Sequence, residues 1–169
     1  GGEAVKNLLY GVANPSGKLA ETWPLEYSDC PLSAYYPLRD GQYREGIYVG
    51  YRYYDKANVP VRWKFGYGLS YTEFTYSNPH LDGDSVRITV TNTGSRAGAE
   101  VVQLYIAPPQ DGLYRPVKEL KRFAKVFLEP GESREISFTL DERCFAVWDG
   151  GWKVPGGKYT VLVGGNPDK

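Results

Sequence analysis

Acidic side chains are the first candidates for chemistry in this sequence, because two neighbouring carboxyl groups can serve as nucleophile and as general acid/base. Most of the acidic residues in the second half fall in expected turns or at strand ends, where carboxylates are usually solvated. These residues are Asp82, Asp84, Asp111, Glu129, Glu132, Asp141 and Asp149. Residues spread over separate turns do not form a close pair, so we expect no catalytic pair of carboxyl groups.

The sequence supports no other type of catalytic, nucleotide-binding or metal site. His80 is the single histidine and follows Asn78 and Pro79 in a turn-like context, and no Gly-x-Ser-x-Gly elbow is present. No phosphate-binding glycine loop or dinucleotide fingerprint appears. Cys30 and Cys144 lie far apart without a CxxC pattern, so a zinc site of the Cys/His type is excluded and we expect free thiols. The sequence therefore implies no cofactor and no metal.

Composition limits the class of partner. The chain has 20 basic and 20 acidic residues among its 169, and its formal net charge is zero. This balance argues against a nucleic acid partner, which requires a basic face. No apolar run reaches the roughly 18 residues of a transmembrane helix, and the mixture of Glu3 and Lys6 near the start is unlike a signal peptide. Nothing in the sequence indicates a compartment.

The first 24 residues read as the end of an α/β unit. Residues 3–10 carry apolar side chains at helical spacing, and Gly11 is a suitable C-terminal stop. A turn over residues 14–17 leads to a short strand over residues 18–23, which Pro24 ends. A whole α/β domain does not fit in this length. The chain also lacks methionine and begins Gly-Gly, so we expect a piece of a longer polypeptide; removal of the initiator alone is the alternative.

Residues 25–70 form an aromatic-rich connector. They are irregular around several prolines, and the alternation over residues 47–54 predicts one strand with aromatic side chains on both faces. Such a segment is expected to wrap across a neighbouring surface. Residues 65–74 place two glycines within an aromatic run, which is typical of a packed junction between two structural units.

From residue 71 onward the pattern is all-β. Val86, Ile88 and Val90 share one face of an expected strand, and residues 102–106 alternate in the same way. The apolar spacing over residues 117–128 breaks strict alternation and predicts a bulge. Further strands are expected at residues 136–140, 145–148, around 152 and 159–163. About seven strands without intervening helices predict a two-sheet antiparallel β-sandwich of immunoglobulin or fibronectin type III character.

These segments together resemble one known family. The run Asn-Pro-Ser-Gly-Lys-Leu at residues 14–19, with Thr-Trp-Pro at 22–24, resembles the end of the α/β sandwich domain of glycoside hydrolase family 3, the β-glucosidase and β-xylosidase family. Residues 45–55 are similar to the segment that follows it. Residues 65–74 are similar to the start of the family's fibronectin type III-like domain. Similar to strands of that domain are residues 90–94, 98–105 and 118–123.

The resemblance implies a division of the chain and of its chemistry. It implies a C-terminal remnant of the α/β sandwich domain at 1–24, a connector at 25–70 and a fibronectin type III-like domain at 71–169. The family hydrolyses β-glycosidic bonds with retention, using two carboxyl groups about 5–5.5 Å apart. Its nucleophile belongs to an upstream barrel and its acid/base to an upstream part of the α/β sandwich. Neither Glu3 nor Glu21 matches the acid/base, so this chain alone is expected to be inactive.

Two functions of different class follow. In the first, the chain is a structural module that braces the catalytic domains of its parent enzyme, and these domains are its partners. In the second, it is a non-catalytic carbohydrate-binding module whose exposed aromatics, with Tyr43, Tyr48 and Tyr114 as candidates, hold a polysaccharide. Adhesion through the sandwich fold rests on analogy alone.

One loop is the candidate for contact with substrate. Asp40, Tyr43, Arg44 and Glu45 cluster on it, with both signs of charge and one aromatic ring. The alternative interpretation of this cluster is an ion pair within the loop.

Overall fold

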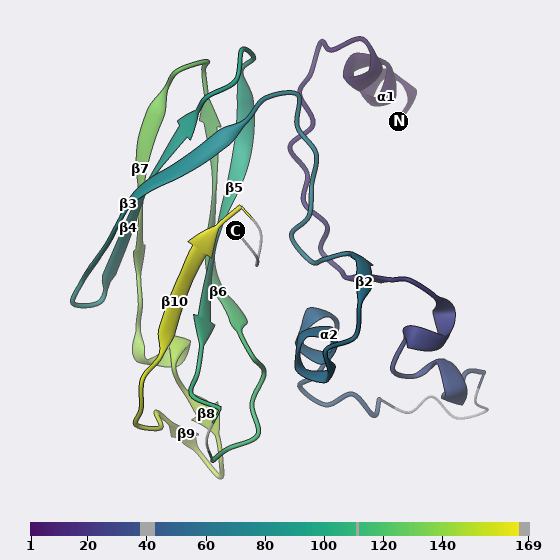
Figure 1. The fold of residues 1–169 in the computed structure, drawn as a ribbon, viewed down its shortest axis with the longest axis vertical. Coiled ribbons are helices and arrows are strands. Elements are labelled where there is room, and N and C mark those ends of the chain that lie inside the picture. Colours follow the sequence, from purple (N-terminus) through teal and green to yellow (C-terminus); the bar gives the residue numbers. More distant parts are fainter. Residues whose placement is uncertain (38–42, 111, 166–169) are drawn as a thin grey trace.

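Two antiparallel sheets pack face to face in the larger part of the molecule (Figure 1). The computed structural model describes residues 1–37, 43–110 and 112–165. One sheet has the order β10–β5–β6, with β5 at Gly98–Ala107, β6 at Glu119–Leu128 and β10 at Thr160–Gly164. The other has the order β3–β4–β7, with β3 at Phe74–Asp82, β4 at Ser85–Asn92 and β7 at Ser133–Thr139. The predicted fibronectin type III-like sandwich is confirmed.

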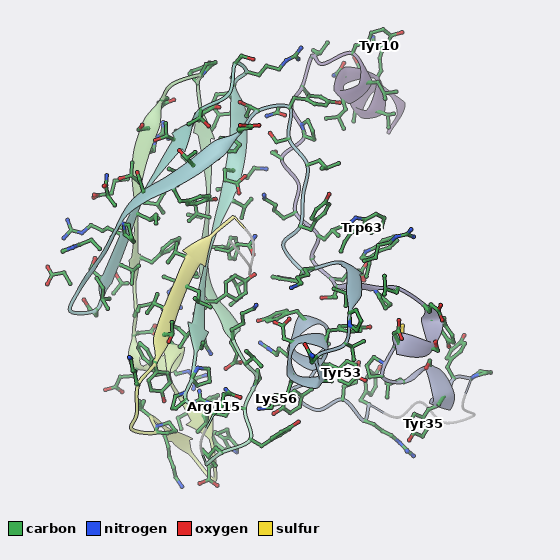
Figure 2. All side chains as sticks on the ribbon, viewed as in Figure 1. Tyr10, Tyr35, Tyr53, Lys56, Trp63 and Arg115 are labelled. Carbon is green, nitrogen blue, oxygen red and sulfur yellow. The ribbon has the colours of Figure 1, made fainter. Side chains whose placement is uncertain are left out.

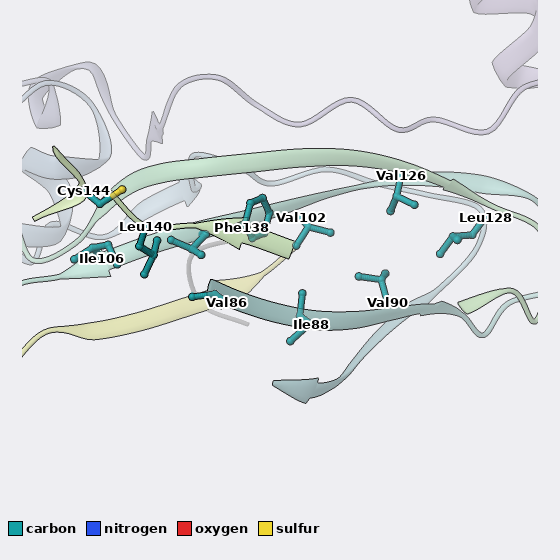
Figure 3. Close-up of a cluster of buried hydrophobic side chains, with 11 residues drawn as sticks. Val86, Ile88, Val90, Val102, Ile106, Val126, Leu128, Phe138, Leu140 and Cys144 are labelled. Atoms are coloured by element: carbon teal, nitrogen blue, oxygen red, sulfur yellow. The ribbon is translucent and has the colours of Figure 1, made fainter. Parts of the chain in front are cut away.

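The core lies between the two sheets (Figure 3). Alternate residues of β4 point inward, and Val90 is fully buried. The facing sheet supplies alternate residues of β5 and β6, because side chains of a strand point to opposite faces in turn. The buried cluster consists of Val86, Ile88, Val90, Val102, Leu104, Ile106, Val126, Leu128, Phe138, Leu140 and Cys144.

Two irregularities interrupt the strand pairing. Leu104 pairs with Arg122 but Tyr105 pairs with Leu120, so one residue of β6 has no partner and the predicted bulge is confirmed. On β3 the pairing shifts between Ser77 and His80. His80 therefore belongs to a strand, and the turn-like interpretation of its surroundings was wrong.

The end of the sandwich carries a small hairpin. A 3-10 helix, η3, spans Glu142–Cys144, and β8 (Val147–Trp148) pairs with β9 (Trp152–Lys153). This is the short strand and return predicted around residues 145–152. Cys30 and Cys144 are both free thiols, as expected.

The N-terminal part has less regular structure. The helix α1 spans Gly2–Leu9 as predicted, and Gly11 follows it with φ of 69°, a left-handed conformation that suits glycine. The strand expected over residues 18–23 is much shorter: β1 is Trp23–Pro24 and pairs with β2, Val61–Trp63. Two 3-10 helices follow β1, η1 at Tyr27–Asp29 and η2 at Ser33–Tyr35.

The strand predicted over residues 47–54 was wrong, because Tyr51–Ala57 forms the helix α2. Gly50 precedes it with φ of 59°, a positive value that suits glycine. Tyr51 and Tyr54 are both buried. Residues three apart share a face on a helix but lie on opposite faces of a strand. The helix packs Tyr51 against Tyr105 of the sandwich and places Tyr54 beside Cys30. None of the helices in the described part of the chain is long and apolar enough to cross a membrane.

Candidate functional site

From here the name connector covers the whole stretch of residues 1–70 that precedes the sandwich. The candidate site is the interface of this stretch with the sandwich, and a buried ion pair lies at its centre. Glu100 sits on the inward face of β5 with 5% of its surface exposed. Lys18 reaches it from the connector, with Nζ 3.0 Å from Oε1. The Tyr76 hydroxyl donates to the same oxygen at 3.0 Å. Burial, reinforced by the Glu100 carboxylate, raises the pKa of Tyr76 far above its usual range.

The two connector segments that carry family motifs bind one another. The Leu19 amide donates to the Tyr67 carbonyl at 2.8 Å, and the Gly66 amide donates back to the Leu19 carbonyl at 2.8 Å. The Asn14 side chain accepts from the Tyr71 amide at 2.8 Å. These bonds join residues 14–19 to residues 65–72 as one ordered strap beside the sandwich (Figure 1).

Two glycines make this strap possible. A Cβ atom on Gly68 would collide with the carbonyl oxygen of Gly17, and one on Gly98 would collide with the side-chain amide of Asn14. The first approach holds the two segments together, and the second places the strap on the start of β5. Gly68, one of the two glycines of the predicted junction, therefore serves close backbone approach.

Aromatic packing fixes the helix α2 to the same sheet. The Tyr51 ring lies 4.9 Å from the Phe65 ring and 6.0 Å from the Tyr105 ring, between their centroids. The Tyr51 hydroxyl accepts a hydrogen bond from the Leu120 amide at 2.8 Å. Burial raises the pKa of this phenol above its ordinary value.

Ion pairs flank that aromatic contact. Asp55 on α2 lies 3.4 Å from Lys118, and Arg52 lies 3.6 Å from Glu119, both measured nitrogen to oxygen. A further polar contact joins the Lys56 ammonium to the Gln110 side chain at 2.6 Å. One face of the connector is thus bonded to the sandwich along its length.

The predicted substrate-contact residues are only partly brought together. Arg44 and Glu45 line a cavity of about 340 Å³ in which the Arg44 guanidinium lies 4.5 Å from the centre of the Tyr35 ring. Tyr43 is 98% exposed and does not line this cavity. Asp40 lies outside the described residues. Among the described residues that line it, the cavity presents one carboxylate, that of Glu45, where retaining hydrolysis needs two.

A second cavity contains two carboxylates, and neither is placed as a catalytic acid. This hairpin cavity, of about 490 Å³, is bounded by the β8–β9 hairpin, residues 113–116 and α2. Glu119 lies between Arg52 at 3.6 Å and Lys121 at 3.3 Å. Asp149 is paired with Lys153 at 2.7 Å. Both carboxylates are thus held in ion pairs with neighbouring cations.

The opposite face of the connector exposes apolar side chains. No residue of α1 is buried, and Leu9 is 76% exposed. Trp63 meets Trp23 edge to face and stacks on Tyr67, with ring centroids 5.5 and 6.5 Å away. Figure 2 shows Tyr10 and Trp63 on the side that faces away from the sandwich. We call this face the outer face; its exposed apolar residues are Val5, Leu9, Tyr10, Val12, Trp23, Trp63, Tyr67 and Leu69.

Sequence reasoning missed both the buried ion pair and the cluster of Trp23, Trp63 and Tyr67. The sequence did indicate that Glu100 needs a partner. Glu100 shares its strand face with Val102 and Leu104, and a carboxylate on a core face requires a partner. No pattern in the sequence identified Lys18 as that partner, because the sequence of an irregular segment does not indicate which part of a sheet it crosses.

Two models of known protein families match this sequence. The model of the glycosyl hydrolase family 3 C-terminal domain matches residues 1–71, and that of the fibronectin type III-like domain matches residues 100–166. The chain belongs to glycoside hydrolase family 3. It corresponds to the C-terminal region of that family with its fibronectin type III-like domain, so the resemblance seen in the motifs is confirmed. The finer division at residues 24 and 70 stays a prediction.

Curated family 3 relatives extend well beyond the matched region. Thermostable beta-glucosidase B of Acetivibrio thermocellus is 43% identical over 96% of this chain, which covers 23% of that protein. Exo-alpha-(1->6)-L-arabinopyranosidase of Bifidobacterium breve is 42% identical over 97% of this chain and 23% of its own length. The chain thus spans about a quarter of these curated relatives.

A solved family 3 structure shares the fold. The Bifidobacterium adolescentis GH3 beta-glucosidase superposes with a TM-score of 0.92 and 44% identity, over 99% of this chain and 26% of that one. The agreement covers the connector as well as the sandwich, because both lie within the matched length.

Proposed function

We propose that this chain is a non-catalytic structural module that braces the catalytic domains of a family 3 glycoside hydrolase. The observation that carries the proposal is the two-sided connector. One side is bonded to the sandwich by Lys18–Glu100, Arg52–Glu119 and Lys118–Asp55. The outer face leaves tryptophan, tyrosine and leucine side chains in solvent, which is the character of a surface that packs on protein.

The parent enzyme would hydrolyse β-glycosidic bonds with retention, through a glycosyl-enzyme formed on a carboxylate. The names of several relatives, which are β-glucosidases, support this chemistry. The arabinopyranosidase is nearly as identical to this chain as the first of them. A region shared by enzymes of different sugar preference is therefore suited to support the sugar pocket and leaves the choice of sugar to other domains.

The bracing role predicts association with catalytic domains that lack this region. The experiment uses Acetivibrio thermocellus beta-glucosidase B from which the equivalent C-terminal region has been deleted. This chain is titrated into it by calorimetry. Leu69→Asp on the outer face is expected to weaken binding at least about tenfold, because a carboxylate is desolvated there without a partner.

The matched control is Leu81→Asp, since Leu81 is also an exposed leucine but lies on β3, away from the connector. It should bind as the unaltered chain does. Failure of the chain to bind, or equal binding by both variants, would remove the support for a bracing role.

We also propose that Asp40, Tyr43, Arg44 and Glu45 lie near the sugar pocket of the parent. The cavity shared by Arg44 and Glu45 is the observation that motivates this. In the parent enzyme, Arg44→Ala should raise KM for an aryl β-glucoside more than it lowers kcat. An unchanged KM would leave the cluster a local contact of the loop.

The carbohydrate-binding alternative is supported by two rings. Tyr43 and Tyr114 are strongly exposed, while Tyr48 is half-buried and packs on Tyr114 with centroids 5.1 Å apart. Retention of the chain on cellulose or xylan, lost on Tyr→Ala change at these positions, would favour this function. Passage through both matrices without retention would reject it.

A further inference from the structure

The hairpin cavity has a second feature that bracing does not require. It lies at the end of the sandwich beside the β8–β9 hairpin, and Figure 2 labels Arg115 at this end. Its volume of about 490 Å³ falls within the range of about 300–1,000 Å³ that is typical of small-molecule sites. Its charged lining residues are Arg52, Arg115, Lys121, Arg143, Glu119 and Asp149.

The charges of this cavity do not balance locally. Glu119 is shared by Arg52 and Lys121, and Asp149 is held by Lys153. Among the described residues, neither Arg115 nor Arg143 forms an ion pair with a carboxylate. The described residues therefore leave these two guanidinium groups of the cavity without a carboxylate partner of their own.

Arg115 is the charge of this cavity whose burial is least compensated. Only 4% of its surface is exposed, and its Nε is buried without a hydrogen-bond partner. Its two terminal nitrogens donate to the Tyr159 hydroxyl and the Phe145 carbonyl, each at 3.2 Å, and both of these acceptors are neutral. A buried charge is stabilised chiefly by an opposite charge, so an anion entering the cavity would be bound favourably.

Flat aromatic rings surround the same cavity. Trp148 and Trp152 are 67% and 55% exposed and meet edge to face, with centroids 5.5 Å apart. The Arg143 guanidinium lies over the Trp152 ring, 3.3 Å from its centre, which holds it beside the aromatic surface. Tyr114 contributes a third exposed ring. The arrangement joins apolar platforms to a guanidinium that can bind a carboxylate through two hydrogen bonds.

We propose that the hairpin cavity binds an oligosaccharide that carries a uronic acid. The C–H faces of the sugar rings pack on Trp148 and Trp152, and the uronate carboxylate pairs with Arg143 and Arg115. A neutral sugar would use the rings and leave the guanidinium groups unpaired. An acidic peptide would use the guanidinium groups, but it has no rigid ring face for the tryptophans. The site is independent of the bracing role, because it lies at the end of the sandwich and not on the outer face.

Two probes that differ only in charge test the proposal. They are the β-1,4-linked trimer of glucose and the β-1,4-linked trimer of glucuronic acid, titrated into the full chain by calorimetry at low salt. The uronate is expected to bind at least about tenfold more tightly, as a charge-assisted bidentate contact implies. Added salt should weaken the uronate complex and leave the neutral one nearly unchanged.

Three variants separate the contributions. Arg143→Gln, at an exposed position, should reduce uronate affinity about tenfold and leave neutral-trimer affinity unchanged. Trp152→Ala should weaken both complexes. Arg134→Gln is the matched control, because Arg134 is an exposed arginine on β7, paired with Glu132 and distant from the cavity.

Several results would overturn the proposal. Equal affinity for the two trimers would remove the role of the carboxylate, and an Arg143→Gln effect no larger than that of Arg134→Gln would remove the site. Binding of a Glu-rich hexapeptide as tightly as the uronate trimer would assign the cavity to a protein partner instead. Circular dichroism of each variant confirms that lost binding is not lost folding.

Discussion

At the scale of single residues, the buried pair of Lys18 and Glu100 is the contact that ties the connector to the core. Both side chains are largely removed from water, so each depends on the other for compensation. Glu100→Gln should lower the free energy of unfolding by about 2–4 kcal/mol, because it leaves the Lys18 ammonium without its counter-charge. Urea denaturation measures the change.

Glu135→Gln is the control, since Glu135 is an exposed glutamate on β7. Its effect should stay within about 0.5 kcal/mol, as for most surface substitutions. If the two variants unfold at the same urea concentration, the pair does not hold the connector.

Tyr54 gives a pH dependence with a definite sign. Burial, reinforced by the neighbouring Cys30 thiol, raises its pKa to about 12. Between the ordinary tyrosine value near 10 and this value, the folded state keeps a proton that the unfolded state has lost. The stabilisation is therefore complete below about pH 10 and is lost as the pH rises to about 12.

Melting temperatures across this range should fall less steeply for Tyr54→Phe than for the unaltered chain, because phenylalanine has no proton to lose. Tyr10→Phe, at an exposed tyrosine, should reproduce the unaltered slope. Parallel curves for all three proteins would show that Tyr54 does not titrate in this way.

At the scale of elements, α2 depends on its docking surface. Tyr51 reaches from this helix to the Leu120 amide of β6. Tyr51→Phe leaves that amide buried without an acceptor and should cost about 1–2 kcal/mol. Hydrogen exchange at Leu120 should accelerate, whereas Tyr53→Phe, which breaks no side-chain hydrogen bond among the described residues, should leave it unchanged. Unaltered exchange in Tyr51→Phe would mean that other contacts hold the helix.

The same helix shows where sequence patterns stop being informative. The sandwich strands were predictable because one face of each is buried. Apolar residues therefore recur at every second position, as in Val86, Ile88 and Val90. Even the β6 bulge could be predicted from a broken period. The segment from Ile47 to Tyr54 has tyrosines on every side, so its period is ambiguous, and tertiary packing chose the helix. Long-range pairs such as Lys18–Glu100 leave no local pattern.

At the scale of the whole molecule, the chain is a sandwich that carries an ordered connector with one bonded and one exposed face. Among the described residues, Glu45 is the one carboxylate that lines the smaller of the two cavities discussed above. In the hairpin cavity, Glu119 and Asp149 are each paired with a cation. This arrangement is the one that the proposed bracing role requires. The exposed outer face also predicts that the free chain self-associates, which concentration-dependent elution in size-exclusion chromatography would reveal.

The most direct test of the central claim is turnover of an aryl β-glucoside by the rigorously purified chain. We expect no release of the aryl group above the buffer blank, because the two cavities discussed above show, among the described residues, one lone carboxylate and two carboxylates held in ion pairs, whereas retaining hydrolysis needs a nucleophile and an acid/base together. Sustained release that disappears on Glu45→Gln or Glu119→Gln would place a catalytic acid within this chain and contradict its assignment as a brace.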